Sequence, residues 1–202
     1  IENSFLIVST GTSDESDIVD AKNILIQNGF NQNNLCFLHC TSEYPAPFKD
    51  INLKVITSLQ KSIGTAIGYS DHSLGIEVSI AAVALGARVI EKHITLDKSA
   101  PGPDHKASID PQELKAMVSA IRNIELSLGS EVKIPTPSEI KNKKLIRKSI
   151  YAKRDISIGE TLSPENITVK RPEEGLSAKH WYDIIGKKTS KSYKKDDPIE
   201  KA

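Results

Sequence analysis

The chain has 202 residues, of which 38% are hydrophobic and 26% are charged, and its formal net charge is +1. This balance is typical of a globular protein and argues against a disordered chain or a dedicated nucleic-acid-binding protein. The sequence holds no apolar run long enough to cross a bilayer and no signal-peptide core. We therefore expect a cytoplasmic protein with no nucleic-acid partner and no membrane association.

Four short apolar runs alternate with helical patterns along the first 130 residues, at residues 5–8, 35–38, 66–69 and 89–94. Such alternation is typical of βα units that build a parallel sheet. Cys36 and Cys40 lie in and just after the second run. Their side chains would point to one face of a strand but lie too far apart for a disulfide, so we expect both thiols to be reduced.

Apolar periodicity and end signals predict helices in the gaps between these strands and a fourth helix after them. Thr12 and Glu15 form a candidate capping box for the first helix. The helix after the third strand is expected at about residues 75–85. The fourth helix begins at Asp110, with Glu113 three residues later as a second capping residue.

After residue 129 the chain becomes rich in proline and lysine and shows little periodicity. We interpret residues 131–148 as a linker. Residues 149–202 hold short alternating segments, such as 149–152 and 167–170, which turns separate. The predicted organisation is a larger α/β domain at residues 1–130, the linker, and a small β-rich domain at residues 149–202.

Polar residues follow each of the four predicted strands. Because the carboxyl ends of parallel strands meet at one edge of a sheet, four polar ends predict a shared pocket there. The segments are Ser9-Thr10-Gly11, the run from His39 to Tyr44, Ser70-Asp71-His72, and Glu91-Lys92-His93 with Thr95.

Two histidines are candidate metal ligands. His72 and His93 lie at the ends of neighbouring predicted strands, where two imidazoles could hold one divalent ion and leave positions open for water or substrate. A structural role for the pair fits the sequence equally well. His39, one strand earlier, is interpreted as a core histidine whose ring is satisfied by the backbone.

Hydroxyl groups and one loop are further candidates for chemistry. Ser9, Thr10, Ser42 and Ser70 could bind phosphate or carboxylate oxygens, although serine and threonine also favour ordinary turns. Residues 101–108 form a turn rich in proline and glycine that presents an acid, an imidazole and an amine. This turn is either a lid with acid–base chemistry or a plain exposed loop.

Several segments occur with an order and spacing that resemble the sialic acid synthase family. They are Ser9-Thr10-Gly11, His39-Cys40-Thr41, Tyr44-Pro45, Gly68-Tyr69-Ser70-Asp71-His72, residues 82–87, Glu91-Lys92-His93-Ile94-Thr95-Leu96-Asp97, Pro101-Gly102-Pro103-Asp104 and Val169-Lys170-Arg171-Pro172. The last lies in a segment similar to the small antifreeze-like (SAF) domain of those enzymes. The implied fold is the C-terminal half of a (β/α)8 TIM barrel, strands five to eight, followed by the SAF domain. Because the first four strands are missing, we expect the chain to be part of a longer enzyme.

The resemblance also implies how the metal and one substrate are held. His72 and His93 would bind a divalent metal, Mn2+ or Mg2+. Ser9, Ser42 and Ser70 would contact phosphoenolpyruvate. Position 42 is asparagine in some members of the family, so the contact of Ser42 is the least certain of the three.

Four more residues would serve the second substrate, an N-acylated hexose. Tyr44, Glu91 and Asp104 would face this acceptor sugar, with the two carboxylates as the catalytic groups. Arg171 would reach from the SAF domain into the pocket of a partner subunit and hold the N-acyl carbonyl. That arrangement implies a domain-swapped homodimer.

The implied reaction condenses phosphoenolpyruvate with a mannosamine-type sugar to give N-acetylneuraminate or legionaminate plus phosphate. The variant at residues 41–47 favours the legionaminate type. One alternative is a non-catalytic module, made of a truncated barrel and a SAF domain, that binds a sugar or a protein. Another is an aldolase with a Schiff-base lysine, for which Lys92 is the candidate, although strand alternation points Lys92 away from Glu91 and His93.

Overall fold

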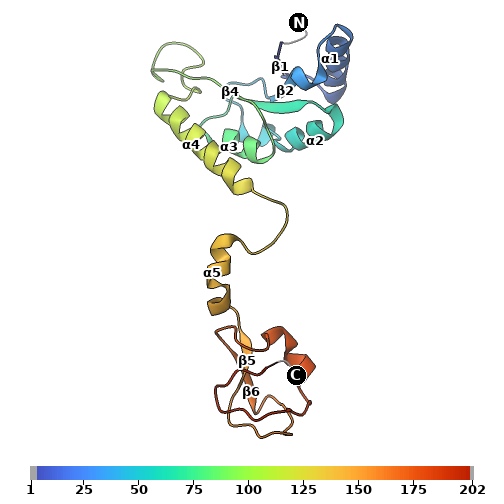
Figure 1. Cartoon of the computed structure of the whole chain (residues 1–202). Coiled ribbons are helices and arrows are strands. Elements are labelled where there is room, and N and C mark those ends of the chain that lie inside the picture. The colour runs from blue at the N-terminus through green and yellow to red at the C-terminus, as the bar shows by residue number, and fades with distance from the viewer. Residues whose placement is uncertain (1–3, 201–202) are drawn as a thin grey trace. The chain divides into compact units, whose positions relative to one another are not determined.

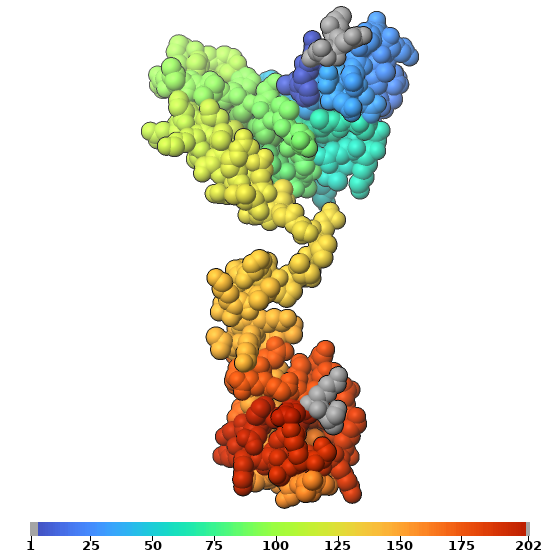
Figure 2. Space-filling view, viewed as in Figure 1, coloured from blue at the N-terminus to red at the C-terminus, as the bar shows by residue number. Residues whose placement is uncertain are grey.

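The computed structural model describes residues 4–200. The chain divides between Ser130 and Glu131 into two compact units, and each is a closely packed body in the space-filling view (Figure 2). No helix among the described residues is both long and apolar enough to span a bilayer. In chain order the elements are β1 (Leu6–Ser9), α1 (Glu15–Gln27), η1 (Gln32–Asn34), β2 (Leu35–Cys40), η2 (Phe48–Asp50), α2 (Lys54–Ile63), β3 (Ala66–Asp71), α3 (Glu77–Ala84), β4 (Ile90–Lys92), α4 (Pro111–Leu128), α5 (Pro137–Ile146), β5 (Ser149–Ala152), β6 (Ile167–Lys170), η3 (Ala178–His180) and α6 (Trp181–Ile184).

The first unit is built on a curled, four-stranded parallel sheet in the order β1-β2-β3-β4 (Figure 1). Parallel strands cannot be joined by a tight turn, and here α1, α2 and α3 lie in the three crossovers. All strand pairs in this sheet are parallel. Their four carboxyl ends therefore lie at the same edge, as the sequence predicts.

Alternation of side chains separates a helix-covered face of this sheet from an opposite face. On the covered face, Phe37, Ile67 and Tyr69 are fully buried and belong to one core with Ile18 of α1 and Ile56 of α2. Figure 1 shows α2 and α3 on the same side of the sheet. The alternate residues of each strand point to the opposite face, and this face carries Ser9, Ser70 and Glu91.

Helix α4 begins where the sequence predicts. The Asp110 carboxylate accepts a hydrogen bond of 2.8 Å from the backbone N–H of Glu113, and the Glu113 carboxylate accepts one from the backbone N–H of Asp110. This reciprocal pair confirms the predicted capping residues. Met117 and Ile121 are buried against α3 in a second apolar cluster, so α4 extends the core away from the sheet.

Helix α1 begins later than predicted, and the expected capping pair of Thr12 and Glu15 is wrong. Asp14 is the cap: its carboxylate accepts from the backbone N–H of Asp17 at 3.0 Å, and the Asp17 carboxylate accepts from Asp14 N–H. Thr12 has a φ of 65°. A capping residue needs an extended backbone, so a left-handed residue cannot fill that position.

The strand ends also differ from the predicted ranges. Strands β2 and β3 run two residues beyond residues 35–38 and 66–69, to Cys40 and Asp71. The last two residues of β2 pair with β3 alone, and Asp71 pairs with Lys92 of β4. Strand β4 is shorter than residues 89–94, and Ile94 makes only an isolated bridge with Ile109. Helix α2 occupies the gap between β2 and β3, where the sequence predicts a helix without bounds, and its buried residues, at positions 56, 59 and 63, have helical spacing.

Both cysteines of β2 are buried and free. This confirms the prediction that Cys36 and Cys40 form no disulfide with each other. Burial raises the pKa of the Cys36 thiol, so this group remains protonated and behaves as a small apolar side chain.

The second unit contains the antiparallel pair β5 and β6, at the residues that the sequence predicts. Ile150 and Ile167 are almost completely buried and form a core with residues from the loops around them. Isolated bridges, such as Ile156 with Tyr193, attach those loops to each other. A small unit with little regular structure is thus held together by one shared apolar cluster.

Helix α5 lies within residues 131–148, the segment interpreted as a linker, where the sequence predicts no helix. The Thr136 hydroxyl accepts from Glu139 N–H, the Glu139 carboxylate accepts from Thr136 N–H at 2.7 Å, and Pro137 occupies the first turn. None of the helix's side chains is buried. A helix without a buried face has no apolar period, so only its capping residues signal it.

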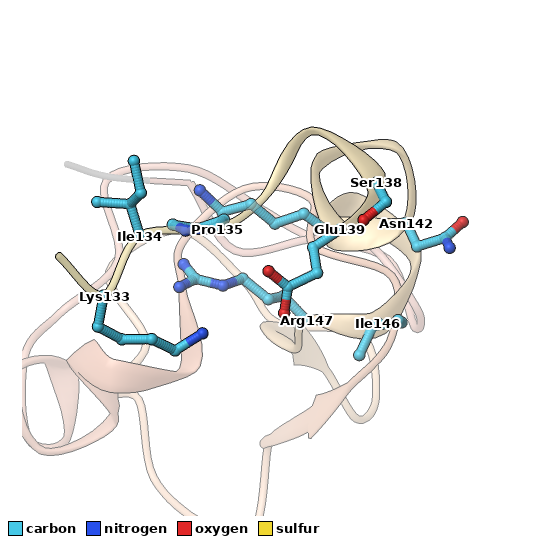
Figure 3. A pocket seen from close by; sticks show the side chains of 9 residues that line it. Lys133, Ile134, Pro135, Ser138, Glu139, Asn142, Ile146 and Arg147 are labelled. Atoms are coloured by element: carbon cyan, nitrogen blue, oxygen red, sulfur yellow. The ribbon is translucent and has the colours of Figure 1, made fainter. Parts of the chain in front are cut away.

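A pocket of about 600 Å3 lies between α5 and the extended residues before it (Figure 3). Lys133 and Ile134 come from the extended segment, whereas Ser138, Glu139 and Asn142 come from the helix. All these side chains are exposed. The pocket shares no residue with the strand ends of the first unit and is therefore not the predicted strand-end site.

Two isoleucines of the second unit provide a test of its core. Ile150 is 0% exposed and Ile158 is 70% exposed. We expect Ile150→Ala to lower the free energy of unfolding by about 2 to 5 kcal/mol, because it leaves a cavity in the core. Ile158→Ala should change it by less than about 0.5 kcal/mol. The single tryptophan, Trp181, packs against this core and reports urea unfolding of the unit by its fluorescence; equal midpoints for the two variants would contradict this assignment.

Candidate active site

The predicted site residues of the first unit share the sheet face opposite the helices. Leu6 and Val8 of β1 pack on the helix-side core, so Ser9 lies on the other face. In the same way Tyr69 and Ile90 pack on the core, which places Ser70 and Glu91 opposite. Ser9, Ser70 and Glu91 therefore belong to one surface, whereas Asp71 and Lys92 lie on the helix side.

Ser42 lies close to the loop that follows β1. A Cβ atom on Gly11 would overlap the Ser42 hydroxyl, so a larger residue at this position would turn the Ser42 side chain away. The neighbouring Thr10 does not point into the site, because both its backbone N–H and its hydroxyl donate to Leu38 O, at 3.0 and 2.8 Å. Of the hydroxyls at this end, Ser9 and Ser42 remain exposed.

The ring of His72 is held in a defined protonation pattern. Its Nδ1 lies 2.8 Å from the backbone carbonyl of Thr41. A carbonyl can only accept, so Nδ1 carries the proton, and in the neutral imidazole Nε2 keeps its lone pair. Nε2 lies 3.2 Å from the Ser70 hydroxyl, whose single proton is donated to Glu91 Oε1 at 2.6 Å. The Nε2 lone pair of His72 is thus left for another ligand.

His93 stands next to His72 and is more exposed. The ring centroids of the two imidazoles are 5.5 Å apart, with the rings perpendicular. The Nδ1 atom of His93 lies 3.9 Å from a carboxylate oxygen of Asp104. That distance is too long for a hydrogen bond, but it brings a negative charge beside the imidazole.

The loop that carries Asp104 is closed at its base and folded on itself. Ile109 N–H donates to His93 O at 2.9 Å, which ties the end of the loop to the site. Within the loop, His105 Nδ1 lies 2.7 Å from the Thr95 hydroxyl, and the carbonyl of Asp104 accepts from Ser108. The turn at residues 101–108 is therefore an ordered segment that presents the Asp104 carboxylate next to His93.

Tyr44 covers the two histidines. Its ring stacks on His72 with centroids 4.0 Å apart and meets His93 edge-on at 5.3 Å. Partial burial, with Cys40 and the carboxylates of Asp104 and Glu91 nearby, raises the pKa of the phenol. The hydroxyl therefore stays neutral and available as a hydrogen-bond donor.

A divalent metal fits this arrangement as an open site. His72 and His93 offer two imidazoles, and the tautomer of His72 leaves Nε2 free to coordinate. No group of three or more His, Cys, Asp or Glu side chains among residues 4–200 is arranged to hold a metal ion. A metal here would take the rest of its ligands from water or substrate, which suits a catalytic ion better than a structural one.

Arg171 belongs to the second unit and is exposed there. Its Nε donates to the carbonyl of Ile146, the last residue of α5, at 2.6 Å. The terminal nitrogens of the guanidinium carry the remaining donors, which can bind an acceptor in a bidentate way. The Arg171–Pro172 peptide bond is cis, and so is the Tyr44–Pro45 bond of the first unit.

Two further sequence interpretations are confirmed. His39 Nε2 lies 2.6 Å from the carbonyl of Ile51, so this ring is satisfied by the backbone as expected. Lys92 points to the helix side and forms an ion pair with Asp71 at 3.1 Å, with both side chains almost fully buried. A lysine held in this way is not available as a Schiff-base nucleophile in the strand-end site.

Sequence reasoning missed the contacts that orient the site. The Thr41 carbonyl is a backbone group, so no residue type signals its contact with His72. The partners of Asp71 were also missed: Ser73 and Ser79 donate to its carboxylate. Strand alternation gave one signal for this network, since it placed Lys92 on the helix side together with Asp71.

Fold and site together define an α/β protein with a candidate site at the carboxyl ends of its parallel strands, joined to a small antiparallel unit. The NeuB family model matches residues 2–133. The SAF domain model matches residues 147–202. The chain therefore belongs to the NeuB family and ends in a SAF domain, which confirms the family that the motifs resemble.

Named relatives agree with this assignment. The chain is 49% identical over 197 residues to an N,N'-diacetyllegionaminic acid synthase of Campylobacter jejuni, covering 98% of this chain and 59% of the relative. It is 44% identical over 168 residues to the human N-acetylneuraminate-9-phosphate synthase, covering 82% of this chain and 47% of that protein. The chain thus spans about half to three fifths of the length of these relatives.

A solved structure shows the same fold. It is the N-acetylneuraminic acid (sialic acid) synthetase of Leptospira borgpetersenii in complex with citrate, with a TM-score of 0.61 and 39% identity. The match covers 67% of this chain and 47% of that one. The α/β architecture is therefore one that an enzyme of sialic acid synthesis also has.

Proposed function

We propose that the full-length protein is a nonulosonate synthase, which condenses phosphoenolpyruvate with an N-acylated mannosamine-type sugar and releases phosphate. One observation carries the proposal. A chain of the NeuB family brings Ser70, His72, Glu91 and His93 together on one face at the carboxyl ends of its strands. Hydroxyls, imidazoles and a carboxylate in one place are the groups that this reaction needs.

We propose further that β1 to β4 are strands five to eight of a (β/α)8 barrel. Among the described residues, β1 and β4 each have a strand neighbour on one side only. Phe5 and Ile7 in and before β1 are 55% and 46% exposed. Parallel sheets are normally covered on both faces, and further strands would cover these side chains.

Three hydroxyls are suited to hold phosphoenolpyruvate. Ser9 and Ser42 are exposed at the ends of the first two strands, and Ser70 lies between Glu91 and His72. The hydroxyls of Ser9 and Ser42 can donate to a phosphate or carboxylate oxygen, and that of Ser70 would do so by turning its proton from Glu91 to the substrate. Their position on one face would fix the C3 atom of the enol towards the second substrate.

Mn2+ or Mg2+, held by His72 and His93, would supply Lewis acidity at the aldehyde oxygen of the open-chain sugar. The protein's own contribution is orientation. The Thr41 carbonyl keeps the Nδ1 proton of His72 and turns its Nε2 towards the site. Tyr44 packs against both rings and limits their rotation.

Glu91 and Asp104 are suited to bind the acceptor sugar and to move protons. Asp104 is half exposed beside His93, and Glu91 accepts a hydrogen bond from the Ser70 hydroxyl. The reaction forms a bond between C3 of phosphoenolpyruvate and the aldehyde carbon, while the aldehyde oxygen gains a proton. Water then adds to C2 and loses a proton, and phosphate leaves with its bridging oxygen. The two carboxylates are the nearest groups for these proton transfers.

We propose that Arg171 completes the pocket of a partner subunit in a domain-swapped homodimer, where its guanidinium holds the N-acyl carbonyl. Two observations support such a contact between the units of different subunits. Residues 1–130 contain 10 Lys and Arg against 15 Asp and Glu, whereas residues 131–202 contain 17 against 11. In addition, α5 leaves Ile140, Leu145 and Ile146 more than half exposed, which a protein surface would cover.

The acceptor sugar that fits best is 2,4-diacetamido-2,4,6-trideoxymannose, which gives N,N'-diacetyllegionaminate. The relative from Campylobacter jejuni is named for this product and is 49% identical. The loop at residues 41–47, which carries Tyr44, supports the same choice. N-acetylmannosamine, which gives N-acetylneuraminate, is the competing acceptor.

Phosphate release by the full-length protein tests the proposal. With Mn2+ and phosphoenolpyruvate labelled with oxygen-18 at the bridging position, we expect phosphate release that depends on the sugar, and the label in the phosphate. The diacetamido sugar should give a higher kcat/KM than N-acetylmannosamine. If neither sugar led to phosphate release, the proposed reaction would be contradicted. Label retained on C2 would contradict cleavage of the C–O bond.

A further inference from the structure

A buried ion pair lies behind the strand-end site, on the helix side of the sheet. Lys92 Nζ is 3.1 Å from Asp71 Oδ2, and the two side chains are 2% and 0% exposed. Asp71 and Lys92 are direct partners in the register of β3 and β4. The pair therefore joins the last residues of two adjacent strands.

Every polar atom of this pair has further partners. Asp71 Oδ1 accepts from the backbone N–H and the hydroxyl of Ser73, at 2.8 and 2.6 Å, and Oδ2 accepts from the Ser79 hydroxyl at 2.5 Å. Lys92 Nζ donates to the carbonyl of Ser73 at 2.7 Å. The network thus links β3, the loop after it, α3 and β4.

The next residue on each strand is one of the two histidines. His72 follows Asp71 and His93 follows Lys92, and because side chains alternate, the imidazoles point to the face opposite the ion pair. Strand β4 has three residues and ends at Lys92. The ion pair is therefore the last side-chain connection between β3 and β4 before the two rings.

A buried ion pair is a poor source of net stability, because the desolvation of two charges offsets most of their attraction. Apolar residues of similar size often stabilise a core as well or better. What a fully hydrogen-bonded pair provides is a fixed geometry. We propose that the Asp71–Lys92 pair is a positioning device, which sets the distance and direction of His72 and His93 so that both reach one divalent cation. This inference rests on the metal site of the proposed function.

Removal of both charges at once tests the proposal. The variant Asp71→Leu/Lys92→Met leaves no unpaired charge, but it removes the hydrogen-bond partners of the buried Ser73 and Ser79, so its urea midpoint should fall. Its affinity for Mn2+, measured by water-proton relaxation on the full-length protein without substrates, should fall by about 10- to 100-fold. Wild-type affinity in the folded double variant would overturn the proposal.

Two more variants distinguish a loss of histidine positioning from a loss of folding stability. Ser79→Ala removes one hydrogen bond to Asp71 without unbalancing charge, so it should fold even where the double variant does not, and should weaken Mn2+ binding by a few fold. Unchanged binding in Ser79→Ala would overturn the proposal in that case. Arg122→Met/Glu125→Leu removes an exposed ion pair of α4 and should leave the affinity unchanged.

The His72→Ala variant distinguishes failure of this inference from failure of the metal site itself. If the unchanged protein binds Mn2+ no better than His72→Ala, the metal site of the proposed function is wrong. If the unchanged protein binds well and the double variant binds equally well, the site stands and only the positioning by Asp71 and Lys92 is wrong. The double variant should also need a higher Mn2+ concentration for half-maximal phosphate release, whereas a smaller folded fraction would lower the maximal rate and leave that concentration unchanged.

Discussion

Replacement of His72 with alanine in the full-length protein should abolish metal-dependent phosphate release while leaving the fold intact. The side chain lies at the carboxyl end of β3, its Nδ1 is held by the Thr41 carbonyl, and its Nε2 faces the site. Loss of a group that only orients a metal ligand typically costs about 10- to 100-fold. Loss of the ligand itself should therefore cost more than about a hundredfold in kcat.

The measurement is phosphate release against Mn2+ concentration. His180→Ala provides a matched control, because this imidazole lies in the second unit and pairs with Asp183, and its removal should leave the rate unchanged. Circular dichroism checks that both variants fold. Full turnover of His72→Ala at saturating Mn2+ would show that His72 is not a ligand.

Replacement of Arg171 with alanine should raise the KM for the acceptor sugar by about 10- to 100-fold, as expected for a lost hydrogen bond from a charged donor. The KM for phosphoenolpyruvate should change little, because the proposed contact is with the N-acyl group. Arg171→Lys keeps the charge but not the planar fork, so it should recover only part of the loss. Equal increases in both KM values would contradict the contact.

Arg154→Ala is the matched control, since this exposed arginine of the same unit pairs with Glu160. Mixed dimers then test whether Arg171 acts in the partner's pocket. A His72→Ala subunit combined with an Arg171→Ala subunit has one site with both residues intact if Arg171 crosses over. Activity restored by mixing supports the swapped dimer, and no restoration means that Arg171 serves its own chain.

Much of the fold could be predicted because its signals are local. The parallel sheet follows from four apolar runs, and Asp110 with Glu113 marks the start of α4. Helix α5 could not be found in the same way, since it buries none of its side chains and has no apolar period. The cap of α1 was misplaced because Thr12 has the composition of a cap but a left-handed backbone, which only the turn around it determines.

The candidate site could also be predicted only in part. Strand ends and alternation were enough to predict that His72, His93 and Glu91 meet on one surface. The contacts that orient them were not predictable, because one is a backbone carbonyl and the other is a network whose members, such as Ser79, lie on a separate helix. Arg171 was assigned by resemblance, since nothing in its local sequence indicates a distant binding partner.

The source of the His72 hydrogen bond has a consequence for how such a loop can evolve. Every residue type has a carbonyl, so position 41 can exchange its side chain without altering the tautomer of His72. The segment after β2 carries both this carbonyl and Tyr44. Selection for a new sugar can therefore change the side chains of this loop while the tautomer and orientation of the neighbouring imidazole stay the same.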